Sequence, residues 1–267
     1  MIKESLRKLI NRVPFLKKNR LYYHIQRYRQ YSPCKVDKSL TTRLDIIDDL
    51  VKDGIVIIPD YLSKSICDQI VSELEPCVTK VLDGTFEGIY SKNQLDQKAF
   101  RIGKVNEYSS TADRHFFNDN VINSIAKSYV SKKAFSYRKE ADYKLEAGHL
   151  LQADLPHFDD WRHRFKAFLY LTDVNEKNAP FVYYKGSHEQ HPWKYKYHLE
   201  FEKYGETGRY GHFFIQEMNK IENDRNYKKL VCIGKAGTLI LADFRGIHKG
   251  TTLLEGKRIL LNNTYGI

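Results

Sequence analysis

Two side chains two positions apart, His157 and Asp159, have the clearest capacity for chemistry. On an extended strand such side chains point to the same side, so both can reach one point while Phe158 faces away. One imidazole, one carboxylate and a third ligand from elsewhere form the facial triad that holds non-haem Fe(II) in oxygenases. We expect His248 to be the third ligand, because it follows residues 236–244, a turn and an apolar run that predict a strand.

A downstream arginine could bind a carboxylate beside this metal. Arg258 comes ten residues after His248, in the run 257–261, which predicts a second strand that could pair antiparallel with the first. A guanidinium fork could hold the distal carboxylate of a 2-oxo acid cosubstrate through two parallel hydrogen bonds. Arg245 and Lys249, which flank His248, could recognise acidic groups of a substrate or simply be solvated.

Other histidines and carboxylates stay open as ligands. His149 and His163 are reserve ligands and Asp160 is a reserve carboxylate, although only Asp159 shares a strand face with His157. We discount the histidines that lack a carboxylate at strand spacing or sit in a turn, namely His188, His191, His198 and His212. Because two histidines and one aspartate also bind zinc, a zinc-dependent hydrolase is an alternative. A non-catalytic barrel that binds or scaffolds a partner is another.

Helices and strands alternate ahead of the candidate ligands. Apolar spacing predicts a helix over 44–51, a buried strand over 55–58 and a helix over 62–74 that starts at a serine cap. Pro76 should disturb that second helix. A further amphipathic helix is expected over 116–129.

The segment 83–110 is rich in Gly, Lys, Tyr and Asn and has weak periodicity, which predicts a loop. It could be an active-site flap in which Arg101 or Lys104 meets an anionic substrate, or a plain surface loop. Residues 137–154 should supply one or two strands that lead to the first metal ligand. Gln152 could touch the cosubstrate or be an ordinary strand residue.

A long aromatic stretch separates two of the predicted core strands. Residues 186–229 form an insertion that could close as a lid over the metal, where aromatic rings suit sugars or acyl chains. The alternative is a helical and loop excursion whose aromatic side chains pack on the barrel.

The order of these features resembles the phytanoyl-CoA dioxygenase family of Fe(II)/2-oxoglutarate oxygenases over roughly residues 45–266. That family shows H-x-D, a strand that ends near Asp, a turn close to N-G-P, then G-S-H, a strand, a distal His and an Arg. Here the turn reads Asn178-Ala179-Pro180, and Pro156 replaces the Trp often found before the first His. The opening helix, strand, Pro-Asp-Tyr-Leu-Ser turn and helix are also similar to the family's.

The resemblance implies an α+β protein with a mainly β core, a double-stranded β-helix of jelly-roll or cupin-like form with flanking helices. Periodicity alone indicates only mixed α and β. The resemblance also implies that His157, Asp159 and His248 hold Fe(II). It implies that Arg258 binds 2-oxoglutarate, with help from Thr251 and Thr252. With O2 as the third reactant and the carboxylate ligand retained, we expect hydroxylation of the substrate and release of succinate and carbon dioxide.

Charge is concentrated at the start of the chain. The formal net charge is +11, and residues 1–35 contribute +9 of it through ten Lys and Arg against Glu4. We expect residues 1–38 to be a basic amphipathic helical leader and residues 39–267 to be the oxygenase domain. The leader could lie on an anionic membrane surface, pack on its own domain or contact a partner. A nucleic-acid partner is disfavoured, because no base-reading fold accompanies the charge.

The four cysteines, Cys34, Cys67, Cys77 and Cys232, show no C-x-x-C or zinc spacing and favour a reducing compartment. No run approaches the ~18 apolar residues that span a bilayer. Charges interrupt the stretch 6–16, which excludes a signal-peptide core. We expect a cytoplasmic protein, peripheral on a membrane if the leader binds lipid, with a small molecule or lipid-linked sugar as substrate.

Overall fold

The computed structural model describes residues 36–92, 98–148, 154–159, 164–189 and 215–267. They belong to one compact unit made of Lys35–Glu189 and His212–Ile267. The predicted leader, except for its last three residues, and the central part of the predicted insertion lie outside the described residues.

The first two long helices begin and end at residues suited to those positions. Helix α3 spans Leu44–Asp53 and ends at Gly54, which adopts the left-handed φ of 76° that glycine tolerates best. Helix α4 spans Lys64–Asp83 and begins after Ser63, whose side chain accepts a hydrogen bond from the third residue of the first turn. The helix continues through Pro76, so this proline does not end it.

Shorter helical segments follow. Helix α6 spans Asn120–Tyr129, within the range predicted to be helical, and the π-helical turn η3 over Asp113–Phe117 precedes it. The remaining segments are η1 (Lys38–Leu40), η2 (Val105–Glu107), α5 (Ser110–Ala112) and α8 (Ile215–Arg225).

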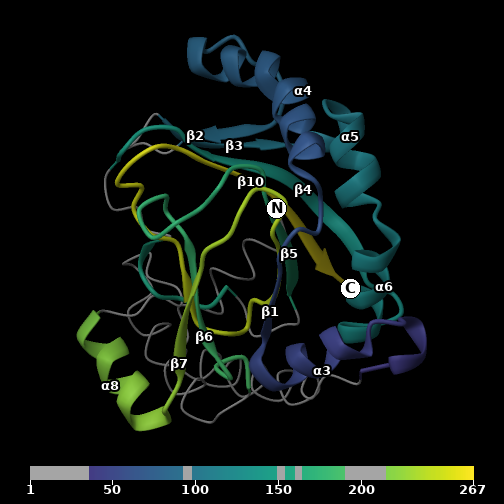
Figure 1. The fold of residues 1–267 in the computed structure, drawn as a ribbon, viewed down its shortest axis with the longest axis vertical. Helices are drawn as coiled ribbons and strands as arrows, with labels where there is room; N and C mark the ends of the chain where they lie inside the picture. Colours follow the sequence, from purple (N-terminus) through teal and green to yellow (C-terminus); the bar gives the residue numbers. More distant parts are fainter. Residues whose placement is uncertain (1–35, 93–97, 149–153, 160–163, 190–214) are drawn as a thin grey trace, which may run out of the picture. The chain divides into compact units, whose positions relative to one another are not determined.

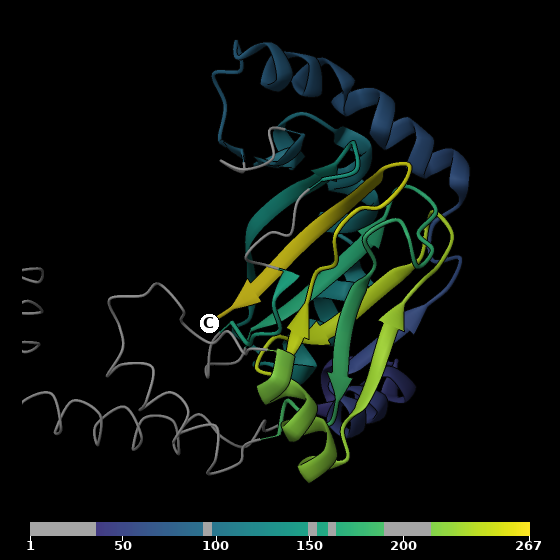
Figure 2. The ribbon, with the colours of Figure 1, turned by 90° about the vertical axis from the view of Figure 1, so that its left-hand side faces the viewer.

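Ten strands of the described chain form two antiparallel sheets (Figures 1 and 2). The larger sheet has the order β1-β8-β5-β10-β4-β3-β2, and the smaller has the order β7-β6-β9. The strands are β1 (Ile55–Ile58), β2 (Tyr90–Lys92), β3 (Ala99–Gly103), β4 (Phe135–Lys144), β5 (Phe165–Tyr170), β6 (Phe181–Lys185), β7 (Lys228–Cys232), β8 (Leu239–Asp243), β9 (His248–Lys249) and β10 (Arg258–Gly266).

Two expectations about these strands are wrong. Strands β8 and β10 do not pair, because β5 lies between them, with Phe168 opposite Ile240 on one side and Asn262 on the other. The segment 83–110 is not a loop throughout, because β2 and β3 extend the large sheet beyond β4. The weak periodicity there arises because these strands are short.

The segment between the core strands β6 and β7 is shorter than the insertion predicted over residues 186–229. Residues 186–188 form a turn directly after β6, and β7 begins at Lys228, so the last two residues of the range belong to the core sheet. Helix α8 occupies part of the segment before β7. Most of the segment for which a lid was one interpretation, residues 190–214, lies outside the described residues.

The faces of the large sheet have different partners. On the outer face, the ring of Phe165 lies 6.0 Å from that of Tyr129 in α6 and 5.7 Å from that of Tyr265 in β10. On the inner face, Phe168 contacts Phe181 of the small sheet, with ring centroids 5.3 Å apart. Aromatic side chains therefore fill one end of the space between the sheets.

Three buried cysteines of the described chain, Cys67, Cys77 and Cys232, are unpaired. None of the helices within the described ranges has both the length and the apolar character that crossing a membrane requires.

Candidate metal centre

Backbone hydrogen bonds bring the two distant histidines together. The N–H of His157 donates to the carbonyl of His248 and the N–H of His248 donates to the carbonyl of His157, each at 2.8 Å. Two residues along, the N–H of Asp159 donates to the carbonyl of Phe244 at 3.1 Å. The H-x-D segment is thus held as an extended chain against the residues that follow β8, which explains why its alternate side chains converge.

The three predicted ligands form one cluster. Each of His157, Asp159 and His248 offers a ligand atom that lies within 4.8 Å of the other two. The Nε2 atoms of His157 and His248 lie 3.6 Å and 3.5 Å from Oδ1 of Asp159. Two nitrogens and one oxygen at this spacing could hold a divalent metal ion between them.

The other ring nitrogen of each histidine fixes the tautomer. Nδ1 of His157 lies 2.7 Å from the carbonyl oxygen of Leu155, and Nδ1 of His248 lies 2.9 Å from that of Gly246. A carbonyl oxygen can only accept, so Nδ1 carries the proton and Nε2 keeps its lone pair. Both rings therefore present the form that binds a metal, oriented by the backbone, and the cluster fits a metal ion.

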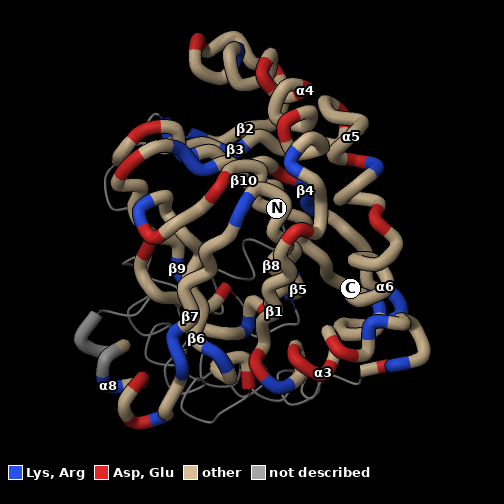
Figure 3. Tube along the Cα trace, viewed as in Figure 1, with Lys and Arg blue, Asp and Glu red and all other residues tan. Residues whose placement is uncertain are grey.

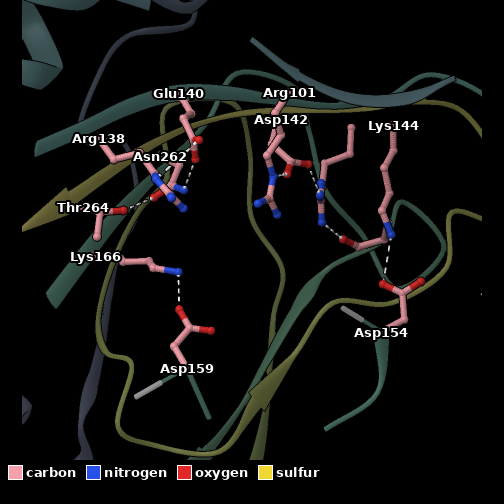
Figure 4. Close-up of polar contacts among 12 residues, drawn as sticks. Arg101, Arg138, Glu140, Asp142, Lys144, Asp154, Asp159, Lys166, Asn262 and Thr264 are labelled. Carbon is pink, nitrogen blue, oxygen red and sulfur yellow. Dashed lines mark hydrogen bonds and ion pairs between the residues drawn. The ribbon is translucent and has the colours of Figure 1, made fainter. Parts of the chain in front are cut away.

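A lysine that the sequence analysis did not single out holds the carboxylate. Nζ of Lys166, from β5, lies 2.6 Å from Oδ2 of Asp159 and 3.9 Å from the ring centroid of Phe244. Burial by itself would raise the pKa of Asp159, but the positive charge of Lys166 beside it holds that pKa well below its usual range. Asp159 is therefore ionised, with Oδ1 facing the imidazoles. Its other oxygen, Oδ2, pairs with Lys166 (Figure 4).

The predicted cosubstrate arginine is buried and partly paired. Arg258 is the first residue of β10, its side chain is 7 % exposed, and its two terminal nitrogens donate at 2.6 Å to Asp142 and to the carbonyl of Ala179. Its Nε is buried and has no hydrogen-bond partner within the described chain. A buried donor without an acceptor is costly, so an incoming carboxylate would satisfy it. The residues present thus fit an anionic cosubstrate.

The ligand cluster and Arg258 share one cavity. It has a volume of 540 Å³ and is lined by residues of both sheets, among them His157, Asp159, His248 and Arg258. Phe168 and Phe244 also line it. A cavity of this size suits a cosubstrate together with part of a small organic molecule.

The other described residues predicted to contact the cosubstrate are not found in the cavity lining. Thr251 and Thr252 follow β9, and neither lines the cavity. The hydroxyl of Thr251 donates to the carbonyl of Pro180 at 2.8 Å, so its one proton is already used. Gln152 lies outside the described residues, as do the reserve ligands His149, His163 and Asp160.

The basic residues beside His248 have separate roles. Arg245 is buried, and its Nε lies 3.0 Å from each carboxylate oxygen of Asp243, so it neither faces a substrate nor is solvated. Lys249 does not line the cavity. His188, which we discounted as a ligand, donates from Nε2 to the carbonyl of Val51 at 3.1 Å and is structural.

A row of charged residues on β4 was missed by the sequence analysis. Arg138, Glu140, Asp142 and Lys144 occupy every second position of the strand, and three of them line the cavity, as does Asp154. Nζ of Lys144 lies 3.0 Å from Asp154. The alternation of these charged residues with others along the strand could have indicated that they share one face. The same alternation is typical of a strand with one face in solvent, so it did not indicate a cavity.

The fold and the site together define a class of protein. Two facing antiparallel sheets with two imidazoles, a carboxylate and a buried arginine in the cavity between them are the features of a metal-dependent double-stranded β-helix enzyme. The sequence profile of the phytanoyl-CoA dioxygenase (PhyH) family matches residues 50–254, and the chain belongs to this family. The expected resemblance is confirmed.

Solved structures share the fold. EctD from S. alaskensis with bound Fe has a TM-score of 0.63 and 14% identity, covering 87% of this chain and 80% of its own. The epimerase SnoN from nogalamycin biosynthesis has a TM-score of 0.58 and 15% identity, over 85% of this chain and 82% of its own. HygX from Streptomyces hygroscopicus, with nickel and 2-oxoglutarate bound, has a TM-score of 0.56 and 15% identity, covering 84% of this chain and 87% of its own. The predicted double-stranded β-helix is confirmed.

A comparison with curated protein sequences finds no match. Membership of the family makes the chain an Fe(II)- and 2-oxoglutarate-dependent oxygenase, as expected, and decides against the zinc hydrolase and the non-catalytic barrel.

Proposed function

We propose that His157, Asp159 and His248 hold Fe(II), that Arg258 binds the far carboxylate of 2-oxoglutarate, and that the chain hydroxylates a small organic substrate. One observation carries this assignment: two imidazole lone pairs, a carboxylate oxygen and an unsatisfied arginine donor meet in a single cavity. When bound, Fe(II) and 2-oxoglutarate activate O2, so that one oxygen atom goes to succinate and the other to the substrate.

The chain's own residues prepare this chemistry. The carbonyls of Leu155 and Gly246 fix both imidazole rings, so the ligand set needs little reorganisation when metal binds. Lys166 occupies one oxygen of Asp159 and leaves the other for the metal. Arg258 orients the cosubstrate from the far end of the cavity, and the rings of Phe168 and Phe244 shield the metal side from water.

Hydroxylation is the outcome we propose among those known for the fold. Structures of this fold include the epimerase SnoN, the carbocyclase SnoK and EctD with 2-oxoglutarate and 5-hydroxyectoine. Asp159 is retained as a carboxylate, and it occupies the position that a halide would need in a halogenating relative. This supports oxygen transfer over halogenation.

The substrate could be carried at a membrane surface. The charge of +9 within residues 1–35 supports binding to anionic lipid, which would bring the enzyme to a lipid-linked sugar or a similar molecule. Removal of residues 1–35 should weaken binding to anionic vesicles and leave the metal content unchanged. Equal vesicle binding with and without the leader would exclude this part of the proposal.

The test of the enzymatic assignment is oxygen-dependent formation of succinate from 2-oxoglutarate by the Fe(II)-loaded full chain. We expect His248→Ala to lose it and Arg258→Gln to raise the KM for 2-oxoglutarate by at least ~10-fold, since a charge-assisted pair contributes about 1.5–3 kcal/mol. Arg114→Gln, at an exposed arginine of η3, is the matched control. Succinate formation by His248→Ala at the wild-type rate, or an unchanged KM in Arg258→Gln, would contradict the assignment.

A further inference from the structure

The cavity carries more positive charge than the reaction centre uses. Seven cationic side chains and three carboxylates line it among the described residues. Besides Lys166 and Arg258, the cations are Lys92, Arg101, Arg138, Lys144 and Arg164, and the carboxylates are Asp142, Asp154 and Asp159. Arg164 also interacts outside this set, and Glu140 lies against Arg138, so the excess of four positive charges falls to two.

Metal and cosubstrate do not remove this excess. Fe(II) adds two positive charges and 2-oxoglutarate adds two negative charges, so the loaded site keeps the same balance. A cavity lined by an excess of positive charge attracts an anion. In Figure 3 the basic residues of β2, β3 and β4 lie close together along the traces of these neighbouring strands.

Arg101 has N–H groups that donate to no described residue. It lies in the middle of β3, opposite Asp142 of β4, and its Nε donates to Oδ2 of Asp142 at 2.7 Å. Its terminal nitrogens make no hydrogen bond with any described residue, and its side chain is 45 % exposed although it lines the cavity. Figure 4 shows it extending from the sheet on the same side as Lys166 and Asp159. Two N–H groups in a fixed plane suit the two oxygens of a carboxylate or phosphate.

Arg138 is a second arginine of this kind. It lies on β4 opposite Thr264 of β10, which in turn lies opposite Lys166 of β5, so Arg138 is two strands from the lysine that holds the metal carboxylate. Its only described ion pair is a 3.6 Å approach of Nε to Glu140. Its terminal nitrogens are therefore available on the metal side of the cavity.

We infer that this enzyme acts on an anionic substrate, a carboxylate or phosphate ester whose charged group is bound by Arg101 and Arg138. The inference rests on the proposed function, because it places the substrate in the same cavity as the metal and cosubstrate. Phe168, Phe181 and Phe244, which line the same cavity, would contact the uncharged part of the molecule. Lys104, the other basic residue considered for this role, pairs with Glu107 and does not line the cavity.

A purely structural role for Arg101 is the competing explanation. Its charge helps to neutralise Asp142, which also pairs with Arg258, so Arg101 could serve only to keep the cosubstrate arginine in place. In that case its loss should weaken 2-oxoglutarate binding and leave the binding of other anions unchanged. Arg138 has no contact with this group in the described chain and separates the two explanations.

The experiment measures binding of small aromatic probes to the full chain, loaded with diamagnetic Zn(II) in place of Fe(II) and with 2-oxoglutarate. The probes are phenyl phosphate, benzoate and neutral benzyl alcohol, and saturation-transfer NMR detects weak binding of their ring protons. The proteins are wild type, Arg101→Gln, Arg138→Gln, Arg101→Lys and the control Arg114→Gln. Because all keep the basic leader, any anion bound there contributes equally.

We expect the anionic probes to bind wild type and Arg114→Gln at least ~10-fold more tightly than benzyl alcohol. Arg101→Gln and Arg138→Gln should each lose at least ~5-fold of this affinity, and Arg101→Lys should recover part of it. Equal binding of the three probes, or equal anion binding by all variants, would overturn the inference. Uncoupled succinate formation by wild type tests the proposed function separately, so either can fail alone.

Discussion

Asp142 and Arg258 form an ion pair between neighbouring strands, β4 and β10, with Oδ1 and the terminal nitrogen 2.6 Å apart. The other oxygen of Asp142 accepts from Arg101 of β3. One carboxylate thus holds both the arginine proposed to bind the cosubstrate and the arginine proposed to bind the substrate. Since the carboxylate neutralises only one of them, the trio keeps one positive charge for an incoming anion.

This trio predicts a specific dependence of stability on pH. Burial alone would raise the pKa of Asp142, but Arg101 and Arg258 lower it to about 2 from 3.8. A lowered pKa stabilises the folded state fully above the unfolded value, and the effect is lost as pH falls through the folded value. We expect Asp142 to contribute about 2 kcal/mol at pH 7, about half of it at pH 3, and little at pH 2.

Urea unfolding of wild type and Asp142→Asn from pH 7 to pH 2.5 measures this contribution. The difference in free energy of unfolding between the two proteins should be constant above pH ~5 and shrink steadily below pH ~4. A difference that stays constant over this pH range would mean that Arg101 and Arg258 do not stabilise the charged form of Asp142.

Lys166→Met should make stability more dependent on metal. Removing the lysine leaves the carboxylate of Asp159, whose side chain is 20 % exposed, without its partner at 2.6 Å, which should cost about 1–3 kcal/mol in the metal-free protein. A bound divalent ion supplies a replacement charge, so Zn(II) should raise the Tm of the variant by more than that of wild type.

The control is Lys185→Met, which breaks an ion pair of the same length with Asp53 and does not line the cavity. Calorimetry with and without Zn(II) should show equal metal-induced shifts of Tm in this control and in wild type. If Lys166→Met also behaves as wild type, the lysine does not govern the charge of the metal site.

His157→Ala should lose the metal and keep the fold. The backbone hydrogen bonds that join this segment to His248 can still be made by alanine, so the change removes a ligand and keeps the segment in place. Metal analysis after anaerobic Fe(II) loading should fall from about one ion per chain to near zero, because two remaining ligands bind weakly. His115→Ala, in η3, should retain metal. Full loading of His157→Ala would point to a different ligand.

The sequence predicted the ligand triad and Arg258, but not their immediate partners. Strand periodicity places His157 and Asp159 on one side, and the position of His248 just after a predicted strand made it the candidate for the third ligand. Lys166 is a single lysine in an apolar strand, and nothing local indicates that it faces a carboxylate seven residues earlier. Pairs of this kind depend on how the second sheet lies over the first.

The charged row on β4 shows the same limit. Arg138, Glu140, Asp142 and Lys144 alternate with residues of the opposite face, a pattern that commonly indicates one solvent-facing side. Here the charged side faces a cavity, because the other face packs under helices and Ala141 is buried there. Likewise, neighbouring segments in sequence suggested that β8 and β10 pair, but the long-range register of β5 separates them.

Replacing Gly237, in the turn before β8, is predicted to lower the free energy of unfolding strongly. Its φ is 92°, and a Cβ there would lie 1.9 Å from the carbonyl oxygen of Leu62, whose N–H in turn donates to the Gly237 carbonyl. Gly237→Ala must therefore move backbone as well as strain its own φ, and we expect a loss of more than ~3 kcal/mol in urea unfolding. Gly84→Ala is the matched control, since Gly84 has a φ of 83° and open space around its Cβ position. It should lose only about 1 kcal/mol, and similar losses in the two variants would show that the close contact with Leu62 relaxes freely.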